Sequence, residues 1–277
     1  MKIEDIYVRE EVSLKPYNTY RINAKSKYFI EINTVEELVK VLKSLKEENI
    51  AYFIVGNGSN IVVDDYFNGV IIKLSGLNDV RVEENQVISG AGAMMATLSS
   101  VSIDANLQGL EWAINIPGTV GGSIVGNAGA YNSCMFDSLV SIKVLDENLE
   151  VKEILASEIS YEYRNTSLKG SKLIVLEATF QLEVGNREEL LQIVEDRRVR
   201  RMVSQPLDFP SAGSVFRNPE GDHAGRLIEA AGLKGKTIGG ASISEKHANF
   251  IVNMGGATSE DIRSLIKLAH DTVLEQF

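Results

Sequence analysis

Ser214 lies in a stretch whose residue types suit a ligand better than a hydrophobic core. The stretch, FPSAGSVFRNPEGDHAGRLIEAAGLKG, packs small and polar residues and two arginines just ahead of a helical pattern. The small neighbours in Ala-Gly-Ser-Val-Phe leave the Ser214 hydroxyl accessible, although spacing alone is equally consistent with a structural serine. A serine hydrolase is weakly supported, because no Gly-x-Ser-x-Gly elbow is present and neither His223 nor His247 has an evident orienting acid.

Arginines provide the other candidate chemistry. Arg164, in YEYRNTSL, has a planar guanidinium beside aromatic groups, which suits two-bond capture of a carboxylate or phosphate, or it covers an edge strand as a surface residue. The sequence DRRVRRM closes a helical stretch that begins near residue 186. Arg197 and Arg198 there form either a solvated helix face or a ligand contact. Arg200 and Arg201, nearest the serine stretch, are the better candidates for ligand contact.

Glycine-rich loops indicate a phosphate site that is not a Rossmann site. GNGSN, residues 56–60, exposes successive backbone N–H groups, and Ser59 and Asn60 add side-chain donors, so the loop is either a phosphate nest or a plain hairpin loop. The third glycine of a dinucleotide fingerprint is replaced by Ile61, and strand-like residues follow instead of a helix. SGAGAMMAT fails similarly with Met95, and no P-loop motif is present.

The stretch INIPGTVGGSIVGNAGAY, residues 114–131, is a second such loop, and its presence favours a phosphate site over plain hairpin loops. It holds five glycines and almost no charge, so its backbone is open to a large flat ligand. Two donor-rich loops separated by strands suggest a diphosphate-containing cofactor bound without a Rossmann fold.

These loops must be positioned by an α+β fold. Helices are predicted from capping boxes at Thr34/Glu37 and Thr258/Asp261 and from apolar stripes that follow them. Other expected helices cover about 93–103, 187–201 and 225–231, and expected strands cover 28–32, 51–55, 61–65, 69–75 and 247–253. The pattern divides into lobes of about 1–75, 76–187 and 188–277.

Composition narrows the class of protein. The 277 residues are 44% hydrophobic, and 28 basic against 38 acidic residues give a net charge of −10, which argues against nucleic-acid binding. No apolar run of about 18 residues is present, and the acidic N-terminus differs from a secretory signal, so we expect a cytoplasmic protein with no membrane partner. The single cysteine, Cys134, and three scattered histidines predict neither a disulfide nor a metal site.

The ordered motifs identify a family. GNGSN, GLEWAINIPGTVGGSIVGNAGAY, YEYRNTSL, QPLDFPSAGSVFRNP, AGRLIEAAGLKG, GGASISEKHANFIVN and ATSEDIRSLI together resemble the UDP-N-acetylenolpyruvoylglucosamine reductase (MurB) family, of its shorter architectural type, over nearly the whole chain. The resemblance implies a two-lobed non-Rossmann FAD-binding domain of the vanillyl-alcohol-oxidase type, with a C-terminal α+β domain that closes over the substrate. It assigns FAD, bound noncovalently, to Gly56, Asn57, Gly58, Ser59, Asn60, Pro117, Gly118, Thr119, Gly121, Gly122 and Ser123.

The resemblance also implies a reaction. NADPH reduces the flavin, which passes a hydride to the enolpyruvyl double bond of a UDP-sugar and so makes UDP-N-acetylmuramate for peptidoglycan. Ser214 then protonates the carbanionic carbon, and Arg164 stabilises charge on the enolpyruvyl carboxylate. Substrate-binding residues are expected to be Arg201, Gln205, Arg217 and Asn218. No partner beyond the UDP-sugar and NADPH is implied, and a monomer is expected.

Three departures from the family pattern lead to further expectations. Asn23 and Ala24 stand where the family has two glycines, and Asn57 replaces a glycine at a place expected to need a positive φ, which asparagine tolerates. The family's C-terminal strand, with its active-site glutamate, has no counterpart before Phe277, so slow hydride transfer to the substrate is expected. The alternatives are therefore a flavin- and nucleotide-sugar-binding relative with impaired turnover, or an FAD oxidase, which would differ in the oxygen reactivity of its reduced flavin.

Overall fold

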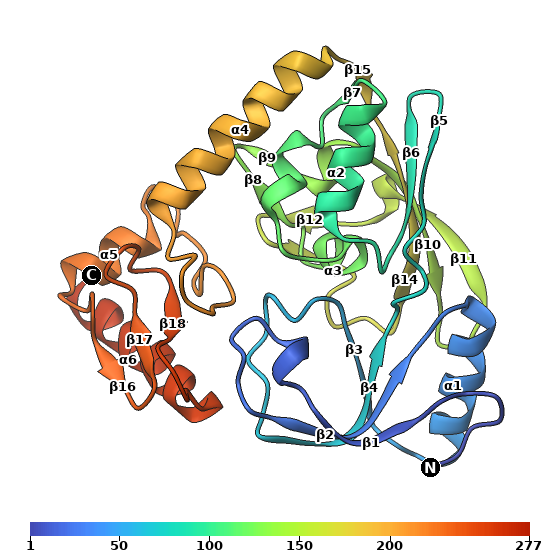
Figure 1. Cartoon of the computed structure of the whole chain (residues 1–277), viewed down its shortest axis with the longest axis horizontal. Coiled ribbons are helices and arrows are strands. Elements are labelled where there is room, and N and C mark those ends of the chain that lie inside the picture. Colours follow the sequence, from blue (N-terminus) through green and yellow to red (C-terminus); the bar gives the residue numbers. More distant parts are fainter. The chain divides into compact units, whose positions relative to one another are not determined.

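A computed structural model describes residues 1–277, and the chain folds into two compact units (Figure 1). The first unit contains residues 1–9, 28–56 and 69–198, and the second contains residues 10–27, 57–68 and 199–277. The chain passes between the units within three strands, β1 (Arg9–Ser13), β2 (Lys25–Glu31) and β4 (Tyr66–Lys73). None of the helices combines the length and the apolar character that a membrane span requires.

A four-stranded sheet of order β1-β2-β4-β3 contains the N-terminal strands, with β3 (Tyr52–Val55) parallel to β4. The predicted helix that joins β2 to β3 is confirmed as α1 (Val35–Glu47). Thr34 caps it by accepting a bond from the Glu37 amide at 3.2 Å. The Glu37 carboxylate, however, accepts from the amide of Asn33 at 2.7 Å. The predicted apolar stripe of α1 is fully buried in the core of the first unit: Leu38, Val41, Leu42 and Leu45.

The expected strand at residues 61–65 is wrong. Its two aspartates serve instead as side-chain anchors within the second unit, where Ser259 donates to Asp65 at 2.9 Å and Arg263 pairs with Asp64. Both partners belong to the last helix of the chain, α6 (Ser259–Gln276).

The core of the first unit is built on a five-stranded antiparallel sheet of order β11-β10-β14-β6-β5. Two helices, α2 (Met95–Asp104) and α3 (Val120–Val125), pack against it (Figure 1). Their buried residues include Leu98 and Ile124, beside the fully buried Trp112. The strands of the sheet are β5 (Val80–Glu83), β6 (Gln86–Gly90), β10 (Leu139–Leu145), β11 (Val151–Leu155) and β14 (Ile174–Gln181). An antiparallel sheet of this kind agrees with the exclusion of a Rossmann fold, whose sheet is mostly parallel.

Shorter elements complete this region. The long helix α4 (Arg187–Ser204) begins in the first unit and ends in the second. The remaining pieces of the first unit are β7 (Leu107–Gln108), η2 (Glu111–Asn115), β8 (Gly129–Ala130), β9 (Ser133–Cys134), η3 (Met135–Asp137), η4 (Ala156–Glu158), β12 (Tyr161–Glu162), β13 (Asn165–Thr166) and β15 (Glu183–Val184), whereas η1 (Lys15–Tyr17) lies in the second unit.

The second unit contains a small antiparallel sheet of order β16-β17-β18, with α6 packed against β16 and β17 (Figure 1). The predicted capping box of α6 is confirmed, since the Asp261 amide donates to the Thr258 hydroxyl at 3.1 Å and the Thr258 amide donates to the Asp261 carboxylate at 2.9 Å. The other elements are α5 (Ala224–Ala230), β16 (Thr237–Ile238), β17 (Ala241–Ile243) and β18 (Ile251–Asn253).

The strand expected from residue 247 begins only at Ile251. The Ser244 hydroxyl accepts hydrogen bonds from the amides of Lys246 and His247, at 3.1 and 3.3 Å, and so holds the preceding residues in a turn. The turn reverses the chain so that β18 pairs with β17. The segment between the two strands carries His247 and Asn249, which contact the residues around Ser214.

Candidate functional site

Backbone hydrogen bonds join SGAGAM, residues 89–94, and the residue that follows it to IPGTVGGS, residues 116–123. The amide of Met95 donates to the Gly118 carbonyl at 3.0 Å, and the amide of Gly121 donates to the Ala91 carbonyl at 2.9 Å. A Cβ at Gly121 would lie 2.9 Å from that of Ala91, so only glycine allows this approach. SGAGAM is therefore a support for IPGTVGGS, and Thr119 caps α3 by accepting from the Gly122 amide at 3.4 Å.

The first glycine of GNGSN also contacts IPGTVGGS, as its packing shows. A Cβ at Gly56 would overlap the Thr119 hydroxyl, so the backbone of the first loop lies directly against the second. The structure thus brings together two of the predicted cofactor-binding segments within the first unit. The rest of the first loop, residues 57–60, belongs to the second unit.

The expectation of a positive φ at Asn57 is wrong. Gly58 adopts that conformation instead, with φ +64°, and a Cβ there would overlap the Tyr17 carbonyl oxygen. The Gly58 carbonyl accepts a bond from the Thr19 amide at 3.1 Å, which fixes the turn. Because Gly58 supplies the left-handed residue, asparagine at position 57 needs no unusual backbone.

Two buried polar atoms in the stretch 114–131 have no protein partner. They are the Nδ2 donor of Asn115 and the Oδ1 acceptor of Asn127, whose residue is only 3% exposed. Burying such groups unpaired is costly, so their presence beside an uncharged glycine-rich backbone fits a ligand that supplies both an acceptor and a donor. FAD meets that requirement. Sequence reasoning missed both asparagines, since only their burial distinguishes them.

Arg164 is held by this same glycine-rich stretch. Its guanidinium donates to the carbonyl of Asn127 at 3.3 Å and to that of Gly129, and its Cζ lies 5.1 Å from the centre of the Tyr163 ring. The residue occupies the β12–β13 hairpin loop with φ +58°, a conformation that costs energy outside glycine. The surface interpretation of Arg164 is therefore wrong, because the side chain is half-buried and directed at backbone carbonyls.

The hairpin that carries Arg164 is itself fastened to the end of α3. The buried Thr166 donates its hydroxyl to the Val125 carbonyl at 2.7 Å, and the Asn127 amide group donates to the Glu162 carbonyl at 2.9 Å. Only two of the five N–H donors of Arg164 are used by the protein, so the others are available to an anion.

Ser214, in the second unit, presents an exposed hydroxyl on a fixed backbone. Its main chain forms an isolated bridge with Phe250, and the Val215 amide donates to the Asn249 carbonyl at 2.9 Å. Gly213, with φ +77°, turns the chain immediately before it. The Nδ1 atom of His247 accepts the Asn249 amide at 3.2 Å, and no hydrogen bond joins the ring to Ser214.

The predicted substrate-binding residues all lie in the second unit, with different degrees of freedom. Arg217 is exposed and has no ion pair, whereas Asn218 accepts the Ala224 amide at 3.1 Å at the start of α5 and keeps its NH₂ group free. Arg201 donates to the Gln205 side chain at 2.8 Å, which orients both.

The other arginines of α4 separate into structural and exposed ones. Arg197 pairs with Glu111 at 3.4 Å and lies over the Tyr131 ring at 4.7 Å, so its role is in packing. Arg198 pairs with Glu195 at 2.7 Å on the solvated helix face. Arg200 is exposed and remains a candidate for ligand contact.

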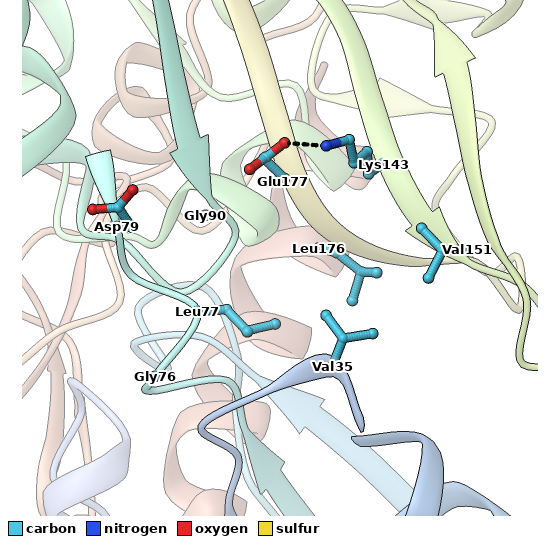
Figure 2. A pocket seen from close by; sticks show the side chains of 9 residues that line it. All are labelled: Val35, Gly76, Leu77, Asp79, Gly90, Lys143, Val151, Leu176 and Glu177. Carbon is cyan, nitrogen blue, oxygen red and sulfur yellow. Dashed lines mark ion pairs between the residues drawn. The ribbon is translucent and has the colours of Figure 1, made fainter. Parts of the chain in front are cut away.

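A separate hollow of about 300 Å³ in the first unit contains none of the predicted site residues (Figure 2). Apolar side chains such as Val35, Leu77 and Leu176 line it. At its rim Glu177 pairs with Lys143 at 2.8 Å, and with Arg81 at 3.0 Å. Glu177 is thus paired with two cations, and none of the predicted site residues lines the hollow. The candidate site residues are therefore the glycine-rich stretch and Arg164 in the first unit and, separately, the Ser214 segment in the second.

Comparisons with known proteins identify a family for this chain. A family model for the UDP-N-acetylenolpyruvoylglucosamine reductase C-terminal domain matches residues 205–277, and one for an FAD binding domain matches residues 26–154. The chain is 42% identical to UDP-N-acetylenolpyruvoylglucosamine reductase from Caldicellulosiruptor bescii, over 100% of this chain and 89% of that protein. The corresponding reductase from Clostridium perfringens is 40% identical over 99% of this chain and 90% of its own length.

Solved structures give the same result. The crystal structure of UDP-N-acetylenolpyruvylglucosamine reductase from Thermus caldophilus superposes with a TM-score of 0.83 at 31% identity, covering 96% of both chains. A glucose oxidase variant of Phl p 4 resembles this chain in fold alone, with a TM-score of 0.51 at 14% identity over 65% of this chain and 42% of that one.

Proposed function

Because the chain belongs to the UDP-N-acetylenolpyruvoylglucosamine reductase family, we propose that Arg164 and Ser214 carry out the catalytic steps of that family's reaction. The protein is an FAD-dependent oxidoreductase that reduces UDP-N-acetylglucosamine enolpyruvate to UDP-N-acetylmuramate with NADPH, in peptidoglycan precursor synthesis. When bound, FAD would supply the hydride chemistry that links oxidation of NADPH to reduction of the enolpyruvyl double bond.

The cofactor would be held by the glycine-rich loops. Backbone amides within residues 56–60 and those of Gly118 and Thr119 would meet the diphosphate and the flavin, and Asn115 and Asn127 would supply one donor and one acceptor. The single observation that carries the proposal is the position of Arg164. Its guanidinium is bonded to the same stretch that contains the unpaired Asn127 oxygen, so the cation would line the cofactor site.

Arg164 would stabilise negative charge that develops on the enolpyruvyl carboxylate as the hydride arrives. A cation already oriented by two backbone carbonyls needs no reorganisation at that moment, which is the condition under which electrostatic stabilisation is most effective. Ser214 would donate its hydroxyl proton to the neighbouring carbanionic carbon, and its exposed hydroxyl has no competing protein acceptor.

Substrate recognition would fall to the second unit. Arg217 and the free NH₂ group of Asn218 follow Ser214 closely in the chain, and they would contact the phosphates or the sugar, together with Arg201 and Gln205. A monomeric state and a cytoplasmic location remain predictions from the sequence, and size-exclusion chromatography tests the first of them.

The purified protein should be yellow, and acid precipitation should release the flavin into the supernatant, because neither histidine nor cysteine occurs within IPGTVGGS to attach it covalently. A colourless protein that does not take up FAD would contradict the proposal. Under air, reduced protein that is reoxidised by oxygen but never by the enolpyruvyl UDP-sugar would indicate an oxidase instead.

A further inference from the structure

Asn249 has its entire side-chain amide committed to the segment that carries Ser214. The residue is 4% exposed, in the HANFIVN motif, and it makes two bonds to Phe216. The Oδ1 atom accepts the Phe216 amide at 2.9 Å, and the Nδ2 atom donates to the Phe216 carbonyl at 2.8 Å. No sequence pattern predicts this contact, because it joins residues that are 33 positions apart in the chain.

Main-chain bonds extend the same attachment toward the serine. The Asn249 carbonyl accepts the Val215 amide at 2.9 Å, and Ser214 forms its bridge with Phe250. Asn249 thus bonds both residues that directly follow Ser214 in the chain. The position of the hydroxyl therefore depends on where Asn249 is held.

Asn249 is itself held from its own side. Its amide donates to the His247 ring at 3.2 Å, and the Phe250 amide donates to the His247 carbonyl at 3.0 Å. The next residue, Ile251, begins β18, which pairs with β17. Asn249 thus connects the segment 214–216 to the sheet that contains β18. Beyond Val215, that segment is not part of a strand.

The other end of the Ser214 segment is fixed separately. The Pro210 carbonyl accepts the Asn253 amide at 2.9 Å. Tyr20 is 2% exposed, and burial raises the pKa of its hydroxyl to about 12 in spite of a hydrogen bond with the Ala212 backbone, which opposes the rise. Between these anchors, Gly213 has an unusual backbone conformation, with φ +77°. On the C-terminal side of the serine, the segment is bonded at Phe216 by the side chain of Asn249.

An amide is the group that this place requires. Phe216 offers a backbone donor and a backbone acceptor, and an asparagine presents the matching acceptor and donor at one length. Aspartate has the same shape but would oppose the Phe216 carbonyl with a second oxygen. We propose that Asn249 is a positioning residue for the reductase reaction, holding the 214–216 segment so that the Ser214 hydroxyl reaches the reacting carbon. The inference rests on the proposed role of Ser214 as proton donor.

The test compares Asn249→Asp, Ser214→Ala and the double variant in the FAD-loaded protein, with each half-reaction followed at the flavin absorbance. Displacing a reacting group by about 1 Å can cost about 10²-fold in rate, and we expect a loss of that order in reoxidation by the enolpyruvyl UDP-sugar. Reduction by NADPH should stay within about twofold of wild type. In the Ser214→Ala background, Asn249→Asp should cause no further loss beyond about twofold, because both act through the same hydroxyl.

Asn253→Asp is the matched control. Asn253 is also a buried asparagine with a satisfied side chain, donating to the Tyr20 carbonyl at 2.8 Å and accepting the Gly255 amide at 2.9 Å, but its side chain does not touch residues 214–216. The bond from Asn253 to Pro210 is a main-chain bond, which Asn253→Asp keeps, so any effect of this variant on reoxidation should multiply with that of Ser214→Ala.

Multiplying effects for Asn249→Asp and Ser214→Ala, or equal loss in both half-reactions, would overturn the positioning role. Asn249→Ser, which is smaller and offers one hydroxyl in place of the amide, replaces the aspartate variant if that does not fold, and failure of both to fold would show that Asn249 is purely structural. A Ser214→Ala variant with normal reoxidation would instead refute the proposed function of the serine itself, which separates the two failures.

Discussion

The Arg164 hairpin in the first unit and the Ser214 segment in the second fix their functional groups in opposite ways. Arg164 is anchored through its reactive head group, whose guanidinium bonds the Asn127 and Gly129 carbonyls. Ser214 is anchored through its backbone, while its hydroxyl is exposed and unpaired. The Arg164 guanidinium is thus already oriented before the substrate binds. At Ser214 the backbone is fixed, but the hydroxyl is free to rotate. Replacing Arg164 itself should therefore disturb the geometry of its hairpin, whereas replacing Ser214 itself should leave the geometry of its segment intact.

The asparagines beside the two regions differ in a related way. Asn249 and Asn253, in the second unit, have all their side-chain groups engaged by protein atoms. In the first unit, Asn127 uses its NH₂ group but leaves Oδ1 buried and unpaired. A region that is satisfied by itself needs no ligand for its order, whereas the hairpin region keeps polar capacity for the cofactor.

The largest expected effect is that of Ser214→Ala. General-acid contributions are typically about 10²–10⁴-fold, and reoxidation of the flavin by substrate should slow by that factor. Reduction by NADPH should remain nearly intact, because only the later step needs a proton at carbon. Equal slowing of both half-reactions, measured by stopped-flow absorbance, would mean that the serine is structural and that the comparison between the two regions fails.

Arg164→Lys should have the next largest effect. The substitution keeps the charge but removes the planar fork that reaches two carbonyls and a carboxylate together, and losing one preorganised electrostatic group costs about 10²–10³-fold in rate. We expect that loss in substrate-driven reoxidation, with a modest change in FAD affinity. If a flavin titration shows FAD lost while substrate binding is unaffected, Arg164 belongs to the cofactor site alone.

Thr166→Val tests the fastening of the hairpin. The variant is similar in shape but leaves the Val125 carbonyl without its 2.7 Å hydrogen bond, so the free energy of unfolding should fall by about 1–3 kcal/mol. Urea denaturation measures this change. Ser171→Ala serves as a control, since Ser171 also donates a local backbone hydrogen bond, to Leu168 at 2.8 Å, but lies outside the hairpin. A Thr166 variant that keeps wild-type reoxidation would show that Arg164 needs no support from this bond.

The smallest effect concerns pH and the second unit. Burial lowers the pKa of His247, and the Lys234 charge lowers it further, against the raising influences of its own backbone and of Glu229. Because the folded-state pKa lies below the ordinary 6.5, the unfolded chain binds the proton more readily. Stability should be fully present above that value and decline as the pH falls through it toward the depressed pKa. Unfolding measured between about pH 7 and about pH 5 should show a steeper decline in wild type than in His247→Asn, and equal slopes would contradict this.

Local chemistry explains which elements the sequence could predict. The helices after Thr34 and Thr258 were predictable because a capping residue and an apolar stripe both lie within one turn of the start. The strand expected at residues 61–65 failed because Asp64 and Asp65 bind side chains of α6, about 195 residues later in the chain. No local pattern contains that information.

The candidate site residues also separate into those that local motifs predict and those that depend on distant parts of the chain. Arg164 and Ser214 were selected by their motifs, and the expected lobes of 76–187 and 188–277 already separated them. The contacts that hold each of them came only with the structure. Asn57 was predicted to need a positive φ, but the neighbouring Gly58 supplies it. The supporting asparagines, 115, 127 and 249, could not be recognised in advance, since their meaning depends on burial and on partners distant in sequence.

The most direct test of the central claim is an anaerobic two-step mixing experiment on the FAD-loaded protein. NADPH should bleach the flavin absorbance, and addition of the enolpyruvyl UDP-sugar should then restore it in a stoichiometric amount, with UDP-N-acetylmuramate as the product. Ser214→Ala and Arg164→Lys should bleach normally and recover slowly. If the wild-type flavin bleaches but is restored only when oxygen is admitted, the reductase function and the roles of both residues are contradicted.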